Sequence, residues 1–469
     1  MPTTSSVNDR VDPALIRLAA VLMVGGIASL LNTTIVGVSL DTIGTDLRAS
    51  VAEVQWAASG YLLALAVVVP TMAFLVDRIG GRRLWRISLV LFTVSSLLCG
   101  AAWSATSLIV FRVLQGFGGG LILPLLQTIL ATAAGPNRLG RVMALVAVPG
   151  QLAPLLGPIL GGMLIDGPGW RWVFWISVPL CVLALVLSWR KLPEVVPATD
   201  RQPLDLGGLA LLCPGLALLL YGSTRLTASA GVLAAGLPVG AGLVLLCWYV
   251  LHTRRRTVPL VDLKLFRFRS FGLASALMLL AGASIFGPMV LLPVFYQQVH
   301  GASGMETGLL LAPLAIGTMA ALPTAGKLTD RLGPRPLLVT GMAIASIGTV
   351  PFVVAPTADH VLLGTALFIR GLGLGLATVP ITAAAYSQLP AELIPQGTTL
   401  ISIVQRIGGS FGTALLLTLL HSRIASGSSV EQAHGFTLAC TLGLSLIALI
   451  PAAFMPRPAT AESTPNARN

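Results

Sequence analysis

The sequence predicts an all-α integral membrane protein, with two six-helix bundles related by pseudo-two-fold symmetry and two extra central helices. Three observations predict this fold class. Of the 469 residues, 55% are hydrophobic and only 10% are charged, whereas a soluble domain carries about 25% charged residues. Fourteen apolar runs approach or exceed the about 20 residues that a membrane-spanning helix needs. One charged turn occurs twice, 253 residues apart.

The first six spans are predicted from the apolar runs of the N-terminal half. The first run is long and has no small-residue cleavage site behind a short apolar core, so we expect an uncleaved anchor. The second run ends at the first charged turn, and the fourth contains an arginine at position 112. The six predicted spans are 14–38, 54–76, 87–105, 107–132, 142–165 and 172–189.

The seventh and eighth spans are predicted at 205–224 and 230–251, between the basic linkers Arg190–Gln202 and His252–Arg269. The last six follow, and the ninth and tenth are broken by proline pairs, which remove helix hydrogen bonds. These six are 270–296, 307–328, 337–356, 360–385, 397–420 and 434–455.

The repeated turn reads AFLVDRIGGRRLW after span two and GKLTDRLGPRPLL after span ten. Repeated halves are how many transporter folds build alternating access. An acid in such a turn can accept hydrogen bonds from the N-terminus of a neighbouring helix and hold one state closed. We therefore expect a gate, with an ordinary interfacial charge anchor as the alternative. Its residues are Asp77, Arg78, Gly80, Arg82, Asp330, Arg331, Gly333 and Arg335.

The position of the second turn also sets the domain division. In a strict six-plus-six protein it would follow span eight, but it follows span ten, so two extra spans must lie between the halves. The expected parts are a cytoplasmic tail at 1–13, an N-terminal bundle at 14–190, linkers and extra helices at 191–269, a C-terminal bundle at 270–455 and a cytoplasmic tail at 456–469.

Basic residues predict the orientation of the chain. With the N-terminus inside, the outer connections contain only Arg48, Arg171, Arg225 and Arg423 among the basic residues of the loops. Cytoplasmic loops carry an excess of Lys and Arg in membrane proteins. Both termini and both charged turns are therefore expected on the cytoplasmic side, and the net charge of +12 is interpreted as a topogenic signal rather than a nucleic-acid surface.

A transport pathway is predicted from polar residues inside apolar spans. Arg112 lies several residues inside its span, and Arg370 and Arg406 lie deeper. An ionised group there is costly and is expected to face the protein interior or water, although Arg112 could instead extend to the surface. Asn32, Gln115, Gln127 and Gln151 could share the same space. Tyr61, Met289, Phe295 and Tyr296 are further candidates for its walls.

Several motifs in order resemble the major facilitator superfamily and its fourteen-span drug:proton antiporter branch. The resemblance extends along nearly the whole chain, and it implies export of small amphipathic compounds in exchange for protons. It also implies an antiporter motif at Gly157, Pro158, Gly161 and Gly162. The matching segments are the two charged turns, LIVFRVLQGFGGGLILP, APLLGPILGG, WRWVFWISVP, RGLGLG and QRIGGSFGTAL.

The chain departs from that branch in its first span. The family usually carries an Asp where this sequence has Asn32, and an amide cannot take up a proton at physiological pH. None of the seventeen acids lies in the middle of a span, although a coupled proton usually needs a carboxylate that is alternately buried and exposed. Asp41 is the preferred substitute. Three interior arginines without an interior acid suggest that the substrates are neutral, zwitterionic or anionic.

The predicted function is therefore secondary efflux of drugs or antibiotics by alternating access, with protons as the expected coupling ion. The alternative is export of an endogenous metabolite or natural product with non-standard or absent proton coupling. A lipid-modifying enzyme would need a polar catalytic cluster, and a sensor that has lost transport is a third class. We expect no enzyme activity, cofactor, metal, ATP or nucleic acid, and a monomer in a bacterial cell membrane.

Overall fold

The computed structural model describes residues 13–135, 138–192, 205–227, 232–256 and 259–456. Nearly all of these residues are helical, and the described parts contain no strand. The predicted tails, except for Pro13 and Pro456, and most of the first basic linker lie outside the described residues.

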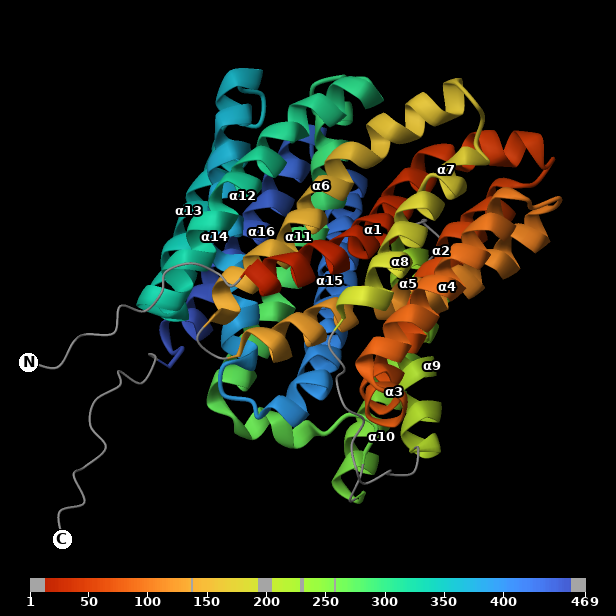
Figure 1. Cartoon of the computed structure of the whole chain (residues 1–469). Helices are drawn as coiled ribbons and strands as arrows, with labels where there is room; N and C mark the ends of the chain where they lie inside the picture. The colour runs from red at the N-terminus through yellow and green to blue at the C-terminus, as the bar shows by residue number, and fades with distance from the viewer. Residues whose placement is uncertain (1–12, 136–137, 193–204, 228–231, 257–258, 457–469) are drawn as a thin grey trace, which may run out of the picture.

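The N-terminal half forms one bundle (Figure 1). Its second span is a helix, a short 3-10 turn at Pro70 and another helix, and its sixth span is divided between two helices. The elements are α1 (Pro13–Asp46), α2 (Val51–Val68), η1 (Val69–Thr71), α3 (Met72–Ile79), α4 (Gly81–Gly100), α5 (Ala105–Ala134), α6 (Leu139–Asp166), α7 (Trp172–Trp175) and α8 (Ser177–Lys191).

Two extra helices and a second bundle follow. The prolines of the ninth and tenth spans do not end their helices, because both run continuously through them. The elements are α9 (Leu206–Thr227), α10 (Val232–Arg254), η3 (Leu263–Arg267), α11 (Arg269–Val299), α12 (Gly304–Leu332), α13 (Pro334–Val354), α14 (His360–Tyr386), η4 (Ala391–Leu393), α15 (Ile394–Ala425) and α16 (Val430–Ala453).

Twelve helical segments of the described chain are long and apolar enough to cross a membrane, so the protein is a multi-pass membrane protein. Two more helices occupy the places of the remaining predicted spans. They are α6, with 28 residues, and α9, with 22 residues. The predicted order of spans is therefore present as helices, and the crossing of the membrane by α6 and α9 stays a prediction.

The two charged turns are sharper than the sequence suggested. The helix before each turn continues through the Asp-Arg pair, and a single residue separates it from the next helix. That single linking residue is Gly80 at φ 81° in the first half and Gly333 at φ 79° in the second. Glycine adopts such a conformation at no steric cost. As a result α4 starts at Gly81, six residues before the predicted span.

The repeat is also visible at the opposite ends of the helices that precede the turns. Ser50 caps α2 and Ser303 caps α12, each in a capping box with a glutamate three residues on, Glu53 and Glu306. These pairs are 253 residues apart, as are the charged turns. The two halves thus share helix starts and ends as well as a motif. We call the end of the bundles with the charged turns the motif end and the other the far end.

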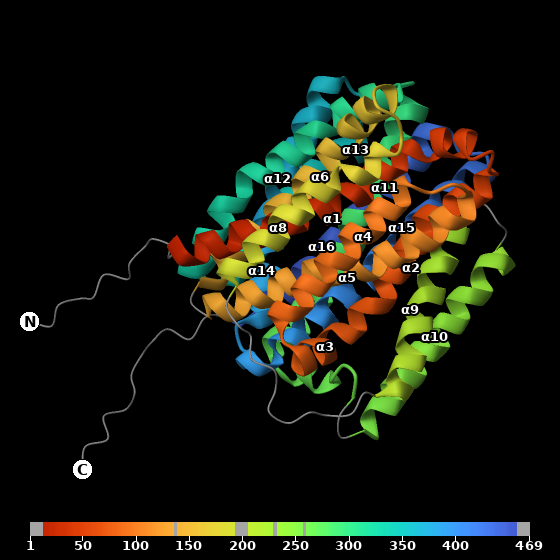
Figure 2. The same cartoon turned by 45° about the vertical axis from the view of Figure 1, so that its right-hand side comes forward.

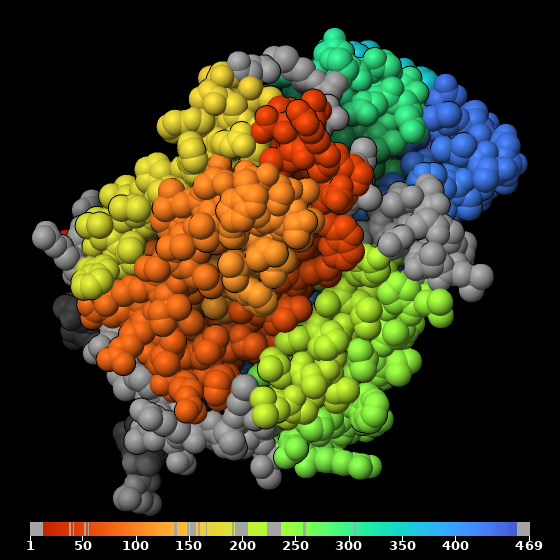
Figure 3. All heavy atoms as spheres, turned by 90° about the vertical axis from the view of Figure 1, so that its right-hand side faces the viewer, coloured from red at the N-terminus to blue at the C-terminus, as the bar shows by residue number. Residues whose placement is uncertain are grey.

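The bundles meet along two sides. On one side α6 packs against α12 and α14, and on the other α15 packs against α5, η1 and α3. The α9–α10 hairpin stands beside the first bundle in all views (Figures 1, 2 and 3). Since α9 contacts both α2 and α15, it bridges the two bundles on this side. An apolar groove of about 380 Å³ remains between α9 and the helices α2, η1 and α5.

Candidate functional site

The second charged turn is bound to the opposite bundle. The backbone N–H groups of Gly140 and Arg141 donate to the two carboxylate oxygens of Asp330 at 2.8 and 3.3 Å, and Arg141 Nε lies 3.3 Å from the same carboxylate. The two donors belong to the first turn of α6, where the helix dipole favours an anion. A Cβ on Gly140 would lie 2.7 Å from the backbone oxygen of Gly326, so this approach of α6 and α12 depends on glycine.

The first turn has no such connection. Asp77 is half-buried, and within the described chain it makes no hydrogen bond or ion pair. Arg78 is exposed, with its guanidinium 5.9 Å from the ring of Phe74 in the same helix. Arg82 donates to the backbone oxygen of Trp189 within the first bundle. In the second turn Arg331 is exposed and Arg335 is half-buried.

Other hydrogen bonds between the bundles lie in the same half of the molecule. The hydroxyls of Thr128 and Thr398 are 2.7 Å apart, and the hydroxyl of Tyr386 donates to Gln127 at 3.4 Å. These residues lie toward the motif end of α5, α14 and α15. For the described residues, every recorded hydrogen bond between the bundles lies in the motif half, so this end is closed.

A polar network surrounds Arg112 inside the first bundle. Its Nη1 donates to Asn32 Oδ1 at 2.7 Å and to Gln115 Oε1 at 2.6 Å, and its Nε donates to the backbone oxygen of Ala57 at 3.1 Å. The guanidinium also lies 4.1 Å from the centre of the Tyr61 ring. The arginine is 1% exposed, so it faces the interior, and the surface alternative is wrong.

The amides of this network are oriented by the arginine. Arginine is a donor only, so the oxygens of Asn32 and Gln115 must face it. Gln115 Nε2 then donates to Ser96 Oγ at 2.7 Å. Asn32 Nδ2 is buried and has no hydrogen-bond partner. A neutral amide thus accepts from a buried charge at the position where the resemblance implies an acid.

A related network surrounds Arg370 inside the second bundle. Arg370 Nη1 donates to Thr349 Oγ1 and Nη2 to the backbone oxygen of Ser284, both at 2.8 Å. In α11 the Ser284 oxygen would normally accept from residue 288, which is a proline and has no N–H. Arg370 therefore satisfies the carbonyl that this proline leaves unpaired.

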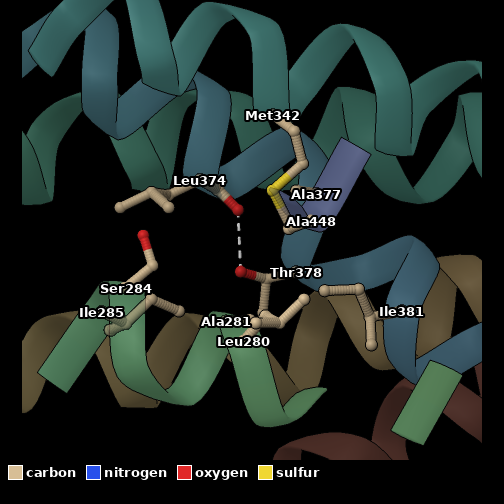
Figure 4. A pocket seen from close by; sticks show the side chains of 10 residues that line it. All are labelled: Leu280, Ala281, Ser284, Ile285, Met342, Leu374, Ala377, Thr378, Ile381 and Ala448. Atoms are coloured by element: carbon tan, nitrogen blue, oxygen red, sulfur yellow. Dashed lines mark hydrogen bonds between the residues drawn. The ribbon is translucent and has the colours of Figure 1, made fainter. Parts of the chain in front are cut away.

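A small cavity lies beside this network in the second bundle. A cavity of about 10 Å³ lies between α11, α13, α14 and α16 (Figure 4). A cavity of this size holds at most about one water molecule. Its walls are apolar apart from Ser284 and Thr378, and the hydroxyl of Thr378 donates to the backbone of its own helix at 2.7 Å. This cavity is too small for a substrate.

Arg406 differs from the other two buried arginines. It is half-buried, makes no hydrogen bond or ion pair with the described residues, and has a buried Nε without a partner. Its charge interacts with Tyr61 of α2, in the opposite bundle. The structure thus brings Asn32, Arg112 and Gln115 together, and Tyr61 is near both Arg112 and Arg406.

The remaining predicted residues are more scattered. Asp41 lies in the far part of α1 and Gln151 in α6, but their side chains are outside the described residues, as is that of Pro158. In the glycine motif, a Cβ on Gly157 would collide with Thr34 of α1, while one on Gly162 would meet open space. Gly161 is buried in α6. Phe295 and Tyr296 are buried in the far part of the second bundle, and Met289 is 46% exposed.

Sequence reasoning missed Ser96, Ser284 and Thr349. Ser96 and Thr349 are 253 residues apart, the spacing of the charged turns, so the repeat was the signal that could have paired them. Among the described residues, no three His, Cys, Asp or Glu side chains are grouped to hold a metal ion.

Comparisons with known proteins identify the family. A model described as Major Facilitator Superfamily matches residues 22–413. A multidrug resistance protein B homolog of Mycobacterium tuberculosis is 40% identical over 459 residues, covering 96% of this chain and 85% of the relative. A tetracenomycin C resistance and export protein of Streptomyces glaucescens is 33% identical over 431 residues, covering 90% and 78%.

A solved structure has the same fold. The crystal structure of the human organic anion transporter MFSD10 (TETRAN) superposes with a TM-score of 0.68 at 15% identity, covering 94% of this chain and 100% of that one. At this identity the likeness concerns the fold alone.

Proposed function

The chain belongs to the major facilitator superfamily, and from this premise we propose that it is a secondary exporter of small amphipathic compounds, including drugs or antibiotics. The observation that carries the proposal is the asymmetric contact between the bundles. Their recorded hydrogen bonds, for the described residues, lie only in the motif half. Two rigid bundles joined at one end can rock about a site between them, which is how repeated transporter folds alternate access.

The charged turns are the proposed gate. In the present state Asp330 is bound to the N-terminus of α6, so release of this contact is needed to open the motif end. The charge bias of the loops supports a cytoplasmic motif end with both termini inside. The protein then acts as a monomer in the bacterial cell membrane, with its pathway between the bundles and lined by Asn32, Gln115 and Arg406.

Coupling to protons is the second part of the proposal. No acid lies beside Arg112 among the described residues, and Asn32 cannot titrate. A coupled proton must therefore bind elsewhere, and Asp41 is the preferred candidate. The other candidates are Glu53, Glu306 and Asp77. The absence of an acid at Asn32 favours, as the alternative, export of an endogenous metabolite or natural product with non-standard or absent coupling.

Transport by the purified protein in liposomes tests both parts. Rhodamine B and its ethyl ester are suitable amphipathic probes, and uptake is followed by fluorescence with and without an imposed pH gradient. We expect exchange of at least one dye above the rate of protein-free liposomes. We also expect faster dye uptake when the liposome interior is more acidic than the outside, because protons then leave as the dye enters. Exchange of neither dye would overturn the proposed function. Dye exchange that does not change with the pH gradient would mean that the protein is a uniporter and not an antiporter.

Asn32→Asp sharpens the coupling test. The new carboxylate would lie at 2.7 Å from Arg112 Nη1, as the amide oxygen does now. We expect transport by this variant to depend more steeply on the pH gradient than transport by the wild type. Asn32→Ser, which also removes the amide but adds no acid, is the matched control.

A further inference from the structure

Arg112, Arg370 and Arg406 lie inside the helical bundles, and of these three only Arg406 lacks a partner among the described residues. Arg112 is bonded to two amide oxygens and a backbone carbonyl, and Arg370 to a hydroxyl and a backbone carbonyl. Arg406 has no hydrogen bond or ion pair with the described chain. It is the twelfth residue after the start of α15 at Ile394, about 18 Å along the helix. A charge left unpaired at such a depth is costly and marks a functional site.

The helix directs this side chain away from its own bundle. Gly408 and Gly412 of α15 pack directly against Leu279 and Ala283 of α11. Residues two positions apart are separated by about 200° around a helix, so Arg406 projects from roughly the opposite side to Gly408. That side faces the first bundle, in agreement with the interaction between Arg406 and Tyr61.

The surroundings of Arg406 combine positive charge with hydroxyl groups. Tyr61 lies against the guanidinium of Arg112 and is close enough to Arg406 to influence it electrostatically, and its hydroxyl is 3.3 Å from Thr33 Oγ1. Thr33 itself is half-buried. No described acid pairs with either arginine, so their charges add and attract an anion to this point between the bundles.

We infer that Arg406 binds a carboxylate of the transported compound, so that the exporter prefers amphiphiles with an acidic group over their neutral-ester or cationic counterparts. A guanidinium matches a carboxylate with two parallel hydrogen bonds, and the ligand supplies the counter-ion that the described residues do not. The apolar remainder of the compound would then lie between the bundles beside Tyr61. This inference rests on the proposed function, since it names the class of compound for the same pathway.

The test compares two dyes that differ in one group. Rhodamine B has a free carboxylate, and its ethyl ester does not. For each dye, transport into proteoliposomes and binding to the purified protein by fluorescence anisotropy are measured. We expect about a tenfold or greater preference of the wild type for rhodamine B, loss of that preference in Arg406→Gln, and partial retention in Arg406→Lys. Arg267→Gln, at an exposed arginine of η3, is the control and should keep the full preference.

The outcomes separate the inference from the proposed function. Transport of the ester alone, or an unchanged preference in Arg406→Gln, would overturn the role of Arg406 while leaving export in place. Transport of neither dye by the wild type would overturn the proposed function and the inference with it. If Arg406→Gln binds the dyes but does not transport them, the dye preference is read from the binding measurement instead. Only variants that keep the melting temperature of the wild type are compared.

Discussion

The two bundles bury an arginine network in equivalent places but use it differently. In the first bundle, Arg112 binds two side-chain amides, Asn32 and Gln115. In the second, Arg370 binds a hydroxyl and the carbonyl that Pro288 leaves without a donor. The equivalence is close: α5 packs glycines 116, 118 and 120 against α2 and α4, and α14 packs glycines 371, 373 and 375 against α12 and α13.

When the three glycines of α5 are aligned with the three glycines of α14, Arg370 corresponds to Gln115 and not to Arg112. Gln115 bonds Ser96 of α4 and Arg370 bonds Thr349 of α13, and the two hydroxyls have the spacing of the repeat. The repeat has therefore kept one hydrogen bond to the neighbouring helix while changing the residue that makes it. Arg370 satisfies a backbone carbonyl of its own bundle, whereas Arg112 places a charge beside two side-chain amides. A shared fold thus carries two different uses of arginine.

The largest effect is expected for Arg112→Met. The substitution removes the only donor that the structure records for the oxygens of Asn32 and Gln115 among the described residues, apart from a weak thiol contact from Cys99. Each buried acceptor left unpaired costs about 1–3 kcal/mol, so we expect a loss of about 2–4 kcal/mol in unfolding free energy. Unfolding in mixed micelles measures it. Arg17→Met, at an exposed arginine, is the control, and an equal loss there would contradict the assignment.

A smaller loss with a specific rescue is expected for Arg370→Met. The Ser284 carbonyl would lose its donor, at a cost of about 1–3 kcal/mol. Pro288→Ala supplies an N–H to the same carbonyl, so the double variant should recover part of that loss. The double-mutant cycle is measured by unfolding in mixed micelles. Strict additivity of the two substitutions would show that the proline and the arginine are not linked.

The charged turns give a third comparison between the halves. Asp330→Asn weakens charge-assisted hydrogen bonds to the backbone of α6, each worth about 1.5–3 kcal/mol, whereas Asp77→Asn breaks no recorded bond in the described chain. We expect Asp330→Asn to open the motif end more often. Cysteines introduced at Thr128 and Thr398, whose hydroxyls are 2.7 Å apart between the bundles, would then cross-link more slowly in that variant. Equal effects of the two substitutions would mean that both turns hold the closed state.

The order of spans and the paired turns could be predicted from the sequence, because both are written in local patterns of apolar and charged residues. The expectation that a turn acid accepts from a neighbouring helix N-terminus describes the geometry at Asp330, although its role as a gate remains a proposal. Which of the two acids is bound could not be predicted, since it depends on the state in which the bundles are held.

From the sequence, Asn32 and Gln115 were expected to share the space around Arg112, and both accept hydrogen bonds from it. The partners of Arg370, by contrast, could not be predicted. The link from Arg370 to Ser284 depends on how α11 and α14 cross, and hydropathy contains no information on that crossing.

Proline positions predicted broken helices in spans nine and ten, but both helices continue through their prolines. In α11, Arg370 satisfies the carbonyl of Ser284 that Pro288 leaves free. The interior location of Arg112 was predicted, whereas the surface exposure of Met289 was not.

The smallest effect is expected at the far end, where the halves are most alike. The backbone N–H and the hydroxyl of Ser50 donate to Glu53 at 2.8 Å, and these bonds hold the pKa of that carboxyl below its ordinary value. Because the pKa of Glu53 is depressed in the folded protein, its ionised carboxyl stabilises the fold above about pH 4.5, the pKa of the unfolded chain. This stabilisation is lost as the pH falls through the pKa of the folded state. Glu53→Gln should therefore lower the melting temperature by about 1 °C at pH 7 and by less at pH 4. Glu306→Gln removes the same cap together with an attraction to His360, so its loss should be larger than that of Glu53→Gln. Identical melting profiles for the two variants would mean that the histidine adds nothing and that the caps are equivalent in both halves.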